Sequence, residues 1–169
     1  MADELFFLIA SDSHRHPNAL IQVWKRQIRT PDALLFLGDG LSDLFAFSAE
    51  FPYVTVYAVS GNCDFHRLLP DGSLAPEERC HRLGGLSVWM THGHRFGVKG
   101  GTGALVREAE RERADIVLYG HTHRQNEFRL QRQDGGSVWL CNPGSIGDDG
   151  SFATLTIRDG VPLIGLGKL

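Results

Sequence analysis

Apolar runs of strand length alternate with helical patterns along the first part of the chain. Leu5–Ala10 is a continuous apolar run. In the segment that follows, Pro17–Arg29, the apolar residues Leu20, Trp24 and Ile28 recur at helical spacing, and a proline suits the first helical turn. This alternation predicts a strand followed by a helix.

The same alternation continues through the next thirty residues. Ala33–Leu37 is a short buried-strand candidate, Leu41–Ser48 is predicted to be helical, and Tyr53–Val59 carries the β-branched and aromatic residues that strands favour. The first third of the chain therefore reads as an α/β protein.

The remainder combines hairpins with one more helix. Gly84-Gly85 is a strong two-residue turn signal between the strand candidates Arg79–Leu83 and Leu86–Thr91. A helix is predicted for Gly103–Ala114 and a strand for Ile116–Tyr119. Two further hairpins are expected, Glu127–Gln133 with Ser137–Leu140 around a turn at Asp134-Gly135-Gly136, and Ser151–Ile157 with Val161–Ile164 around a turn at Arg158-Asp159-Gly160. These elements predict an α/β protein with a mixed sheet.

Composition bounds the class of protein. A chain of 169 residues with 42% hydrophobic and 22% charged residues suits one globular domain, spanning 1–169. Its net charge of −3 gives no reason to expect nucleic acid as a partner. The apolar run before Ser11 and Asp12 is too short for a signal peptide or a membrane span, so we expect a cytoplasmic protein. The three cysteines show no paired spacing and are expected to be isolated, reduced thiols.

Five short polar islands carry the candidate chemistry, and each follows a predicted strand. The islands are Ser11-Asp12-Ser13-His14, Gly38-Asp39-Gly40, Gly61-Asn62-Cys63-Asp64, Thr91-His92-Gly93-His94 and Gly120-His121-Thr122-His123. Ligands collect at the carboxyl ends of strands in open α/β sheets, so we expect the islands to converge. Each motif taken singly is a weak signal, and a lone Asp-x-His is more often a helix cap and a turn residue than a metal site.

The residue types in these islands indicate metal ions. Carboxylates mixed with imidazoles favour a borderline divalent ion such as manganese, iron, cobalt, nickel or zinc. Five histidines, the aspartates Asp12 and Asp39, and one asparagine exceed what a single ion can use. Two ions about 3.5 to 4 Å apart could instead share a bridging aspartate and activate a water molecule.

The ordered motif set resembles the calcineurin-like metallophosphoesterase family, and in particular its small bacterial and archaeal phosphodiesterases. The motifs that carry the resemblance are Asp12-x-His14, Gly38-Asp39, Gly61-Asn62-x-Asp64, His92, Gly120-His121-x-His123 and Asn142-Pro143-Gly144-Ser145. The resemblance implies a mixed β-sandwich flanked by helices in four layers, α/β/β/α, with the terminal hairpins completing the second sheet. It also implies that minimal members form dimers or tetramers, although no residue here specifies an interface.

The resemblance further implies a ligand set. In that set Asp12, His14 and His123 hold one metal, Asn62, His92 and His121 hold the other, and Asp39 bridges the two. The catalytic candidates are then Asp39, Asn62 and His92, with manganese as the expected metal. Without the family pattern, the choice between His92 and His94 would be close to even.

One position departs from the wider family. Relatives often carry a histidine after the asparagine, as a proton donor to the leaving group, and this chain has Cys63 there. A thiol with its usual pKa of about 8.5 is a poor replacement, so a metal-polarised water or His94 would serve, or the substrate would be an activated ester such as an aryl ester.

Other residues have two readings. Asp64 orients either a ligand histidine or its own turn. Arg15, Arg95 and Arg124 adjoin the candidate ligands and are either substrate contacts or solvated surface residues. The glycine-rich segment 96–103 lacks the ending of a P-loop and is expected to form the rim of the pocket.

The expected activity is hydrolysis of a small phosphate ester, most simply as a phosphodiesterase using two divalent ions. The alternatives are a phosphomonoesterase with the same centre, a non-catalytic scaffold like the retromer subunit of this fold, and a nuclease. The intact ligand set disfavours the scaffold, and the acidic charge disfavours the nuclease.

Overall fold

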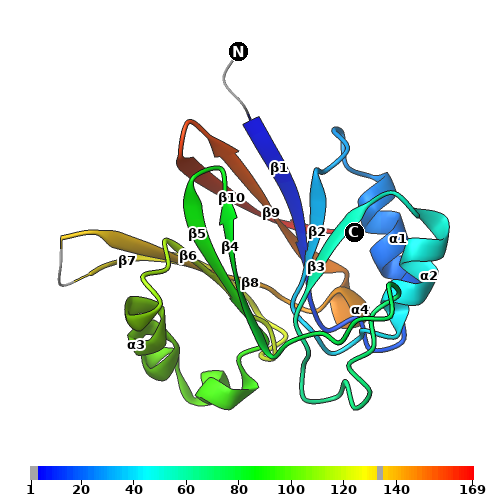
Figure 1. Ribbon diagram of the computed structural model, residues 1–169, viewed down its shortest axis with the longest axis horizontal. Helices are drawn as coiled ribbons and strands as arrows, with labels where there is room; N and C mark the ends of the chain where they lie inside the picture. Colours follow the sequence, from blue (N-terminus) through cyan, green and yellow to red (C-terminus); the bar gives the residue numbers. More distant parts are fainter. Residues whose placement is uncertain (1–3, 133–134) are drawn as a thin grey trace.

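The computed structural model describes residues 4–132 and 135–169, which form two five-stranded mixed sheets (Figure 1). The strand order is β10-β9-β1-β2-β3 in the first sheet and β4-β5-β6-β8-β7 in the second. The strands are β1 (Glu4–Ala10), β2 (Ala33–Phe36), β3 (Thr55–Ala58), β4 (Glu78–Leu83), β5 (Leu86–Thr91), β6 (Ile116–Leu118), β7 (Gln125–Gln131), β8 (Ser137–Pro143), β9 (Ser151–Arg158) and β10 (Val161–Lys168).

Helices cover the outer faces of both sheets. In Figure 1, α1 and α2 lie against the first sheet and α3 lies against the second. The helical segments are α1 (Pro17–Lys25), α2 (Asp43–Glu50), α3 (Gly103–Arg111), α4 (Ile146–Asp149) and the 3-10 turns η1 (His94–Phe96) and η2 (Val98–Gly100). Three apolar clusters fill the spaces between successive layers. This arrangement confirms the predicted four-layer α/β/β/α architecture.

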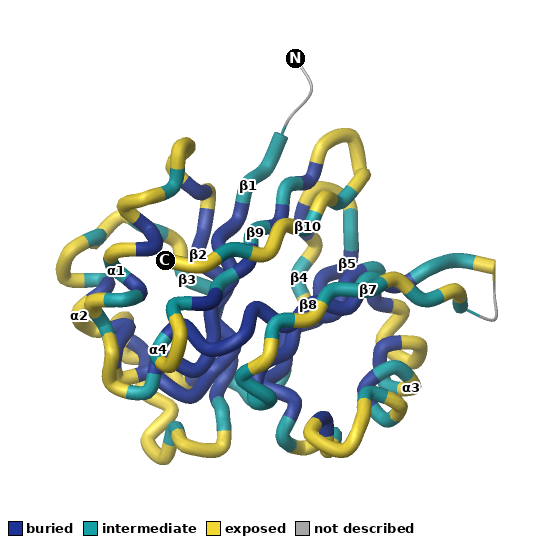
Figure 2. The backbone as a smooth tube through the Cα atoms, turned by 180° about the vertical axis from the view of Figure 1, so that it is seen from behind, coloured by how far each residue is buried: buried dark blue, intermediate teal, exposed yellow. Residues whose placement is uncertain are grey.

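The apolar run Leu5–Ala10 of β1 is explained by burial of the strand on both faces. Phe7 and Ile9 belong to the cluster between the two sheets, whereas Leu8 and Ala10 belong to the cluster under α1 and α2. A strand covered on both faces has no solvent side to mark with polar residues. Figure 2 shows β1 and β2 buried along most of their length.

The hairpin predicted at Gly84-Gly85 is confirmed. Strands β4 and β5 pair antiparallel with Leu83 opposite Leu86. Both glycines have positive φ, 53° and 84°, as a two-residue hairpin turn of this hand requires.

The prediction for the terminal hairpins was half right. Strands β7 and β8 do complete the second sheet, but β9 and β10 extend the first, where β9 pairs antiparallel with β1. The reason is packing, because Ala153, Leu155 and Ile157 of β9 join the cluster between the sheets beside Phe7 and Ile9. Gln133 and Asp134, predicted to end a strand and begin a turn, lie outside the described residues.

The first helix is shorter than its periodicity predicted. It ends at Lys25, and Ile28 is fully exposed rather than buried beside Leu20 and Trp24. The side-chain amide of Gln27 donates to the carbonyl of Val23 at 2.8 Å, which occupies an acceptor that another helical turn would use.

The sheet topology brings the polar islands to one edge of the molecule. Strands β1, β2 and β3 are mutually parallel, and so are β5, β6 and β8. Their carboxyl ends therefore point the same way within each sheet. Among the described residues, every helix is too short or too polar to cross a bilayer.

Candidate metal centre

Contacts between the two sheets join the polar islands at this edge. The ring Nδ1 of His92, which follows β5, donates to the carbonyl of Leu37 beyond β2 at 2.7 Å. The backbone amide of His121, which follows β6, donates to Oδ2 of Asp12 beyond β1 at 3.1 Å. The predicted convergence of the islands is therefore present in the structure.

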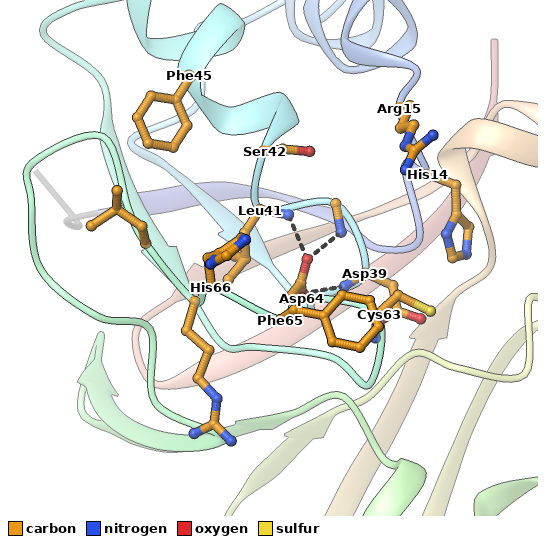
Figure 3. A pocket seen from close by; sticks show the side chains of 13 residues that line it. His14, Arg15, Asp39, Leu41, Ser42, Phe45, Cys63, Asp64, Phe65 and His66 are labelled. Atoms are coloured by element: carbon orange, nitrogen blue, oxygen red, sulfur yellow. Dashed lines mark hydrogen bonds between the residues drawn. The ribbon is translucent and has the colours of Figure 1, made fainter.

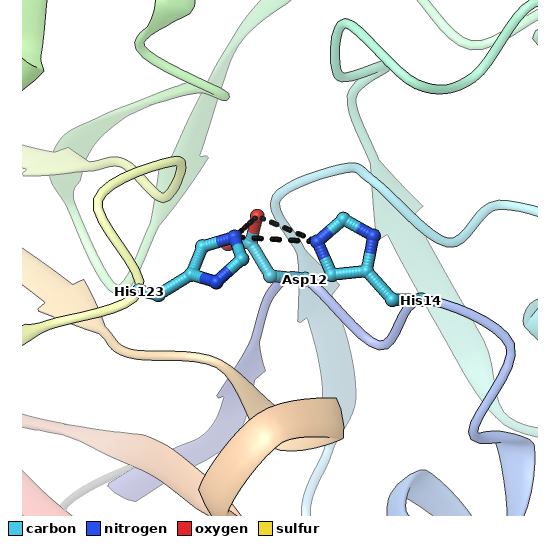
Figure 4. A group of neighbouring side chains, drawn as sticks. All are labelled: Asp12, His14 and His123. Atoms are coloured by element: carbon cyan, nitrogen blue, oxygen red, sulfur yellow. Dashed lines mark hydrogen bonds and ion pairs between the residues drawn. The ribbon is translucent and has the colours of Figure 1, made fainter.

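One group of candidate ligands consists of Asp12, His14 and His123 (Figure 4). The Nε2 atoms of His14 and His123 lie 3.2 Å apart, and Oδ1 of Asp12 lies 3.7 Å and 3.1 Å from them, respectively. Three potential ligand atoms thus face one another.

A second group consists of Asp39, His92 and His121, whose ligand atoms lie within 4.8 Å of one another. Because Nδ1 of His92 donates to a carbonyl, Nε2 is the atom left for this group, and it lies 3.2 Å from Oδ2 of Asp39. The same Nε2 lies 3.9 Å from Oδ1 of Asp12, so the two groups adjoin.

The three shortest of these separations, 3.1 to 3.2 Å, fit ligands of a common metal ion. Ligand atoms that surround an ion at about 2.1 Å lie roughly 3.0 to 3.4 Å from one another. Asp12 supplies further support, because its Oδ2 accepts from the Ser11 hydroxyl and the His121 amide, whereas its buried Oδ1 has no hydrogen-bond donor among the described residues. An unsatisfied carboxylate oxygen facing imidazole nitrogens is what a cation would complete.

The charges of the site are set by burial and by mutual contact. Burial raises the pKa of Asp12, and the positive charge of His92 offsets this only in part. Burial also acts on Asp39, but contact with His92 and the Cys63 amide outweighs it and holds the Asp39 pKa well below its usual range. Burial, with the charge of His92, lowers the pKa of His121 to about 4. Asp39 is therefore ionised and His121 neutral near pH 7, as metal ligation requires.

Most of the candidate ligands occupy strained backbone. Positive φ values between 43° and 69° occur at Asp12, His14, Asp39, His121 and His123. Residues with a Cβ rarely adopt this left-handed conformation, and where they do the surrounding structure must hold them. The strain therefore marks positions whose side-chain direction is fixed by the fold.

Asp64 supplies much of the support for the Asp39 turn. Its carboxylate accepts from the backbone amides of Asp39, Gly40, Leu41 and Gly61 at 2.7 to 2.9 Å. The Gly61 amide lies in the turn of Asp64 itself, as one of its two expected roles required, whereas the other three belong to the Asp39 turn.

The Asn142–Ser145 motif supports the two ligand turns on the other side. Nδ2 of Asn142 donates to the carbonyl of Gly120 at 2.9 Å and to Oγ1 of Thr122 at 3.0 Å, which fixes the turn that carries His121 and His123. The hydroxyl of Ser145 donates to the carbonyl of Asp12 at 2.8 Å. The sequence reasoning noted this motif but assigned it no structural role.

Asp148 is a site residue that sequence reasoning missed. Its Oδ2 lies 2.6 Å from Nδ1 of His123, and this contact leaves Nε2 of the ring facing Asp12 and His14. A carboxylate behind a ligand histidine fixes the ring and its tautomer. The available signal was the acidic pair Asp148-Asp149, which follows the late motif after two intervening residues.

Asn62 is an exposed residue whose Nδ2 donates to Sγ of Cys63 at 3.3 Å. Its place as a ligand of the second ion stays a prediction. Cys63 is closer to the centre than predicted, because its Sγ forms a third potential ligand group with His14 and Asp39. Burial and the neighbouring Asp39 raise the pKa of the Cys63 thiol.

The remaining predicted contacts divide between the site and the surface. His94 is half-buried, with its ring centre 5.4 Å from that of His92 and 6.0 Å from that of His121. Arg124 is exposed, and the guanidinium of Arg95 pairs with Glu77. The ring of His94 is thus at the centre, whereas Arg95 is held away from it by an acidic partner.

Comparison with known proteins agrees with this geometry. The model of the calcineurin-like phosphoesterase superfamily domain matches residues 5–160. The chain belongs to this superfamily. Another member, the probable metallophosphoesterase YsnB of Bacillus subtilis, is 33% identical over 140 residues, which span 82% of this chain and 73% of YsnB.

Solved structures of other proteins share the fold. A Streptococcus pneumoniae protein described as a predicted phosphoesterase superposes with a TM-score of 0.76 at 26% identity, covering 98% of this chain and 90% of the other. Vacuolar Protein Sorting 29 of Cryptosporidium parvum superposes with a TM-score of 0.73 at 19% identity, covering 98% of each chain. The expected family and fold are thereby confirmed.

Replacing Asp64 by alanine is expected to destabilise the protein. Four backbone amides would lose a charged acceptor, so the free energy of unfolding should fall by about 2 kcal/mol or more. Urea denaturation measures the change, and Asp71→Ala is the control, because Asp71 accepts only within its own exposed turn. Equal stability of the Asp64 variant and wild type would show that the four bonds contribute nothing.

The metal-free protein is expected to show an unusually acidic His121. The unfolded ring takes up a proton near pH 6.5 and the folded ring near pH 4, so this residue makes the fold less stable as pH falls from about 6.5 to about 4. An NMR titration of the ring resonances, assigned with His121→Gln, should give the lower midpoint. A midpoint near 6.5 would contradict the environment described for this ring.

Proposed function

We propose that this superfamily member hydrolyses small phosphate esters, preferably diesters, with two divalent metal ions. The observation that carries the proposal is the pair of adjoining ligand groups, Asp12 with His14 and His123, and Asp39 with His92 and His121. Asp39 has ligand atoms near His14 of the first group as well as near His92 and His121, so it would bridge the ions. Asn62 would join the second ion through its side-chain oxygen.

Divalent ions held by these residues would lower the pKa of a water molecule, which makes it a nucleophile at neutral pH, and would neutralise charge on the phosphate oxygens. The protein's part is to hold the ligands in place. Asp148 fixes the His123 ring, Leu37 fixes the His92 ring, and Asp64 fixes the turn of Asp39. Such support keeps the ligand atoms in position as the reaction proceeds.

The presence of Cys63 at this position favours substrates with good leaving groups. A thiol with its usual pKa of about 8.5 would protonate a departing alkoxide poorly. We infer that aryl esters, whose leaving oxygens need little protonation, react faster than alkyl esters. Manganese is the proposed metal, because mixed carboxylate and imidazole ligands suit it, as they suit iron, cobalt, nickel and zinc.

A scaffold role has one observation in its favour, which is the fold shared with Vacuolar Protein Sorting 29 over nearly the whole chain. Likeness of fold does not carry a function with it. The unsatisfied Oδ1 of Asp12 among three imidazole nitrogens is a costly arrangement for a scaffold to keep without a metal.

Metal-stripped protein should be inactive towards bis(p-nitrophenyl) phosphate and p-nitrophenyl phosphate, and added manganese should restore activity, with the diester preferred. Asp39→Asn should lower the restored kcat/KM by more than about 100-fold, because it removes the bridging charge. Asp159→Asn is the control, since it makes the same change in an exposed turn distant in sequence. Folded protein without turnover in manganese, nickel, cobalt, zinc or magnesium would favour the scaffold.

Asp148→Ala should weaken manganese binding by about 10- to 100-fold, because the His123 ring loses its carboxylate partner. Calorimetric titration of the metal-stripped protein measures this. Asp149→Ala is a matched control, because it removes the same charge from the neighbouring position, where the carboxylate pairs with Lys168 instead. Equal weakening by both changes would assign the effect to net charge rather than to the His123 contact.

A further inference from the structure

A cavity of about 900 Å³ opens beside the candidate metal centre (Figure 3). Two candidate ligands, His14 and Asp39, and the adjacent Cys63 form part of its wall. A molecule whose phosphate sat on the metals would therefore place an ester group in this space. The volume is that of a site for a small organic molecule.

Several large apolar side chains with exposed surface line the cavity. Phe65 is 88% exposed, and Phe45 and Leu68 are each 44% exposed, and all three line the cavity. In Figure 3, Phe45 extends from α2 on one side of the hollow, and Phe65 lies towards Asp39 and Cys63. Large apolar side chains gathered around a cavity mark a binding site more often than chance exposure does.

The segment that carries Phe65 is anchored at both ends. The amide of Ser60 donates to the carbonyl of Pro76 at 2.8 Å, and the amide of Ala75 donates to the carbonyl of Arg67 at 2.8 Å. Leu69 and Ala75 of the same segment are buried in the cluster under α1 and α2. Phe65 is therefore exposed on a segment that is otherwise packed into the molecule.

The opposite side of the cavity is tied to α2. Oδ2 of Asp43, in the first turn of α2, accepts from the Ser13 hydroxyl at 2.5 Å and from the Arg15 amide at 3.0 Å. Arg15 also lines the cavity, and its backbone is left-handed with φ of 68°. The cavity thus combines two aromatic rings with a cation beside the metal-binding edge.

We propose that this cavity binds a planar aromatic group esterified to the substrate phosphate, with Phe65 stacking on the ring and Arg15 facing the phosphate. The inference rests on the proposed function and narrows it to aromatic phosphate esters. A nucleobase and a simple aryl ring share this chemistry. Rings stack in offset or edge-to-face contact, which two exposed phenylalanines on different elements can provide.

The test uses three diesters that share p-nitrophenol as the leaving group and carry methanol, phenol or the 5′-oxygen of thymidine as the second alcohol. For each protein, kcat/KM is measured with manganese, and the phenyl-to-methyl ratio reports use of the cavity. Phe65→Ala should lower this ratio about fivefold or more, and Phe65→Tyr should restore it. Tyr53→Ala is the control, because Tyr53 is 99% exposed and lies outside the cavity wall.

A binding readout separates this inference from the proposed function. Phenylphosphonate should bind the manganese-loaded protein more tightly than methylphosphonate, and Phe65→Ala should remove the difference. Turnover of all three diesters with an unchanged phenyl-to-methyl ratio in Phe65→Ala would overturn the cavity assignment and leave the hydrolase standing. Absence of turnover together with absence of phosphonate binding would overturn both. A thymidyl preference above the phenyl preference would identify the nucleobase as the ring that fits.

Discussion

The structure depends on one buried carboxylate. Oδ1 of Asp12 faces the Nε2 atoms of His14, His92 and His123 at 3.1 to 3.9 Å, while its other oxygen is occupied by Ser11 and His121. Asp12 follows a strand of the first sheet, whereas His92 and His123 follow strands of the second. The edges of both sheets therefore meet at this oxygen, and its buried charge requires a partner that the described residues do not supply in full.

Most of the candidate ligands adopt an unfavourable left-handed backbone conformation, which neighbouring hydrogen bonds stabilise. Ligand residues with left-handed backbone are held by groups that are not ligands themselves, notably the four amide bonds to Asp64 and the bonds from Asn142 to the Gly120–Thr122 turn. A Cβ at Gly61 would collide with the Asp39 carboxylate, so the third island must pack closely against the second. Residues that are not ligands thus hold the turns that carry the candidate ligands.

The sequence predicts those features that depend on local pattern, namely the positions of the strands and of the polar residues at their ends. Apolar runs located the strands, and the polar islands at their ends located Asp12, His14, Asp39, His92, His121 and His123. It does not predict contacts between distant segments, such as Asp148 with His123, because no local period reports them. The same limit applies to two other features. Strand β9 joined the first sheet because it packs beside Phe7 of β1. The helix from Pro17 ended early, where the Gln27 side chain binds a helix carbonyl. Asn62, assigned from the family pattern, stays a predicted ligand, and its amide contacts Sγ of Cys63.

The central claim is that one edge of the double sheet holds two ions joined by a shared carboxylate. Electron paramagnetic resonance of the metal-stripped protein loaded with two equivalents of manganese tests it most directly. A bridged pair about 3.5 to 4 Å apart should give the spectrum of two exchange-coupled ions. Asp39→Asn should convert that spectrum into the signal of isolated manganese. An isolated-ion spectrum from the wild-type protein at full loading would contradict the account.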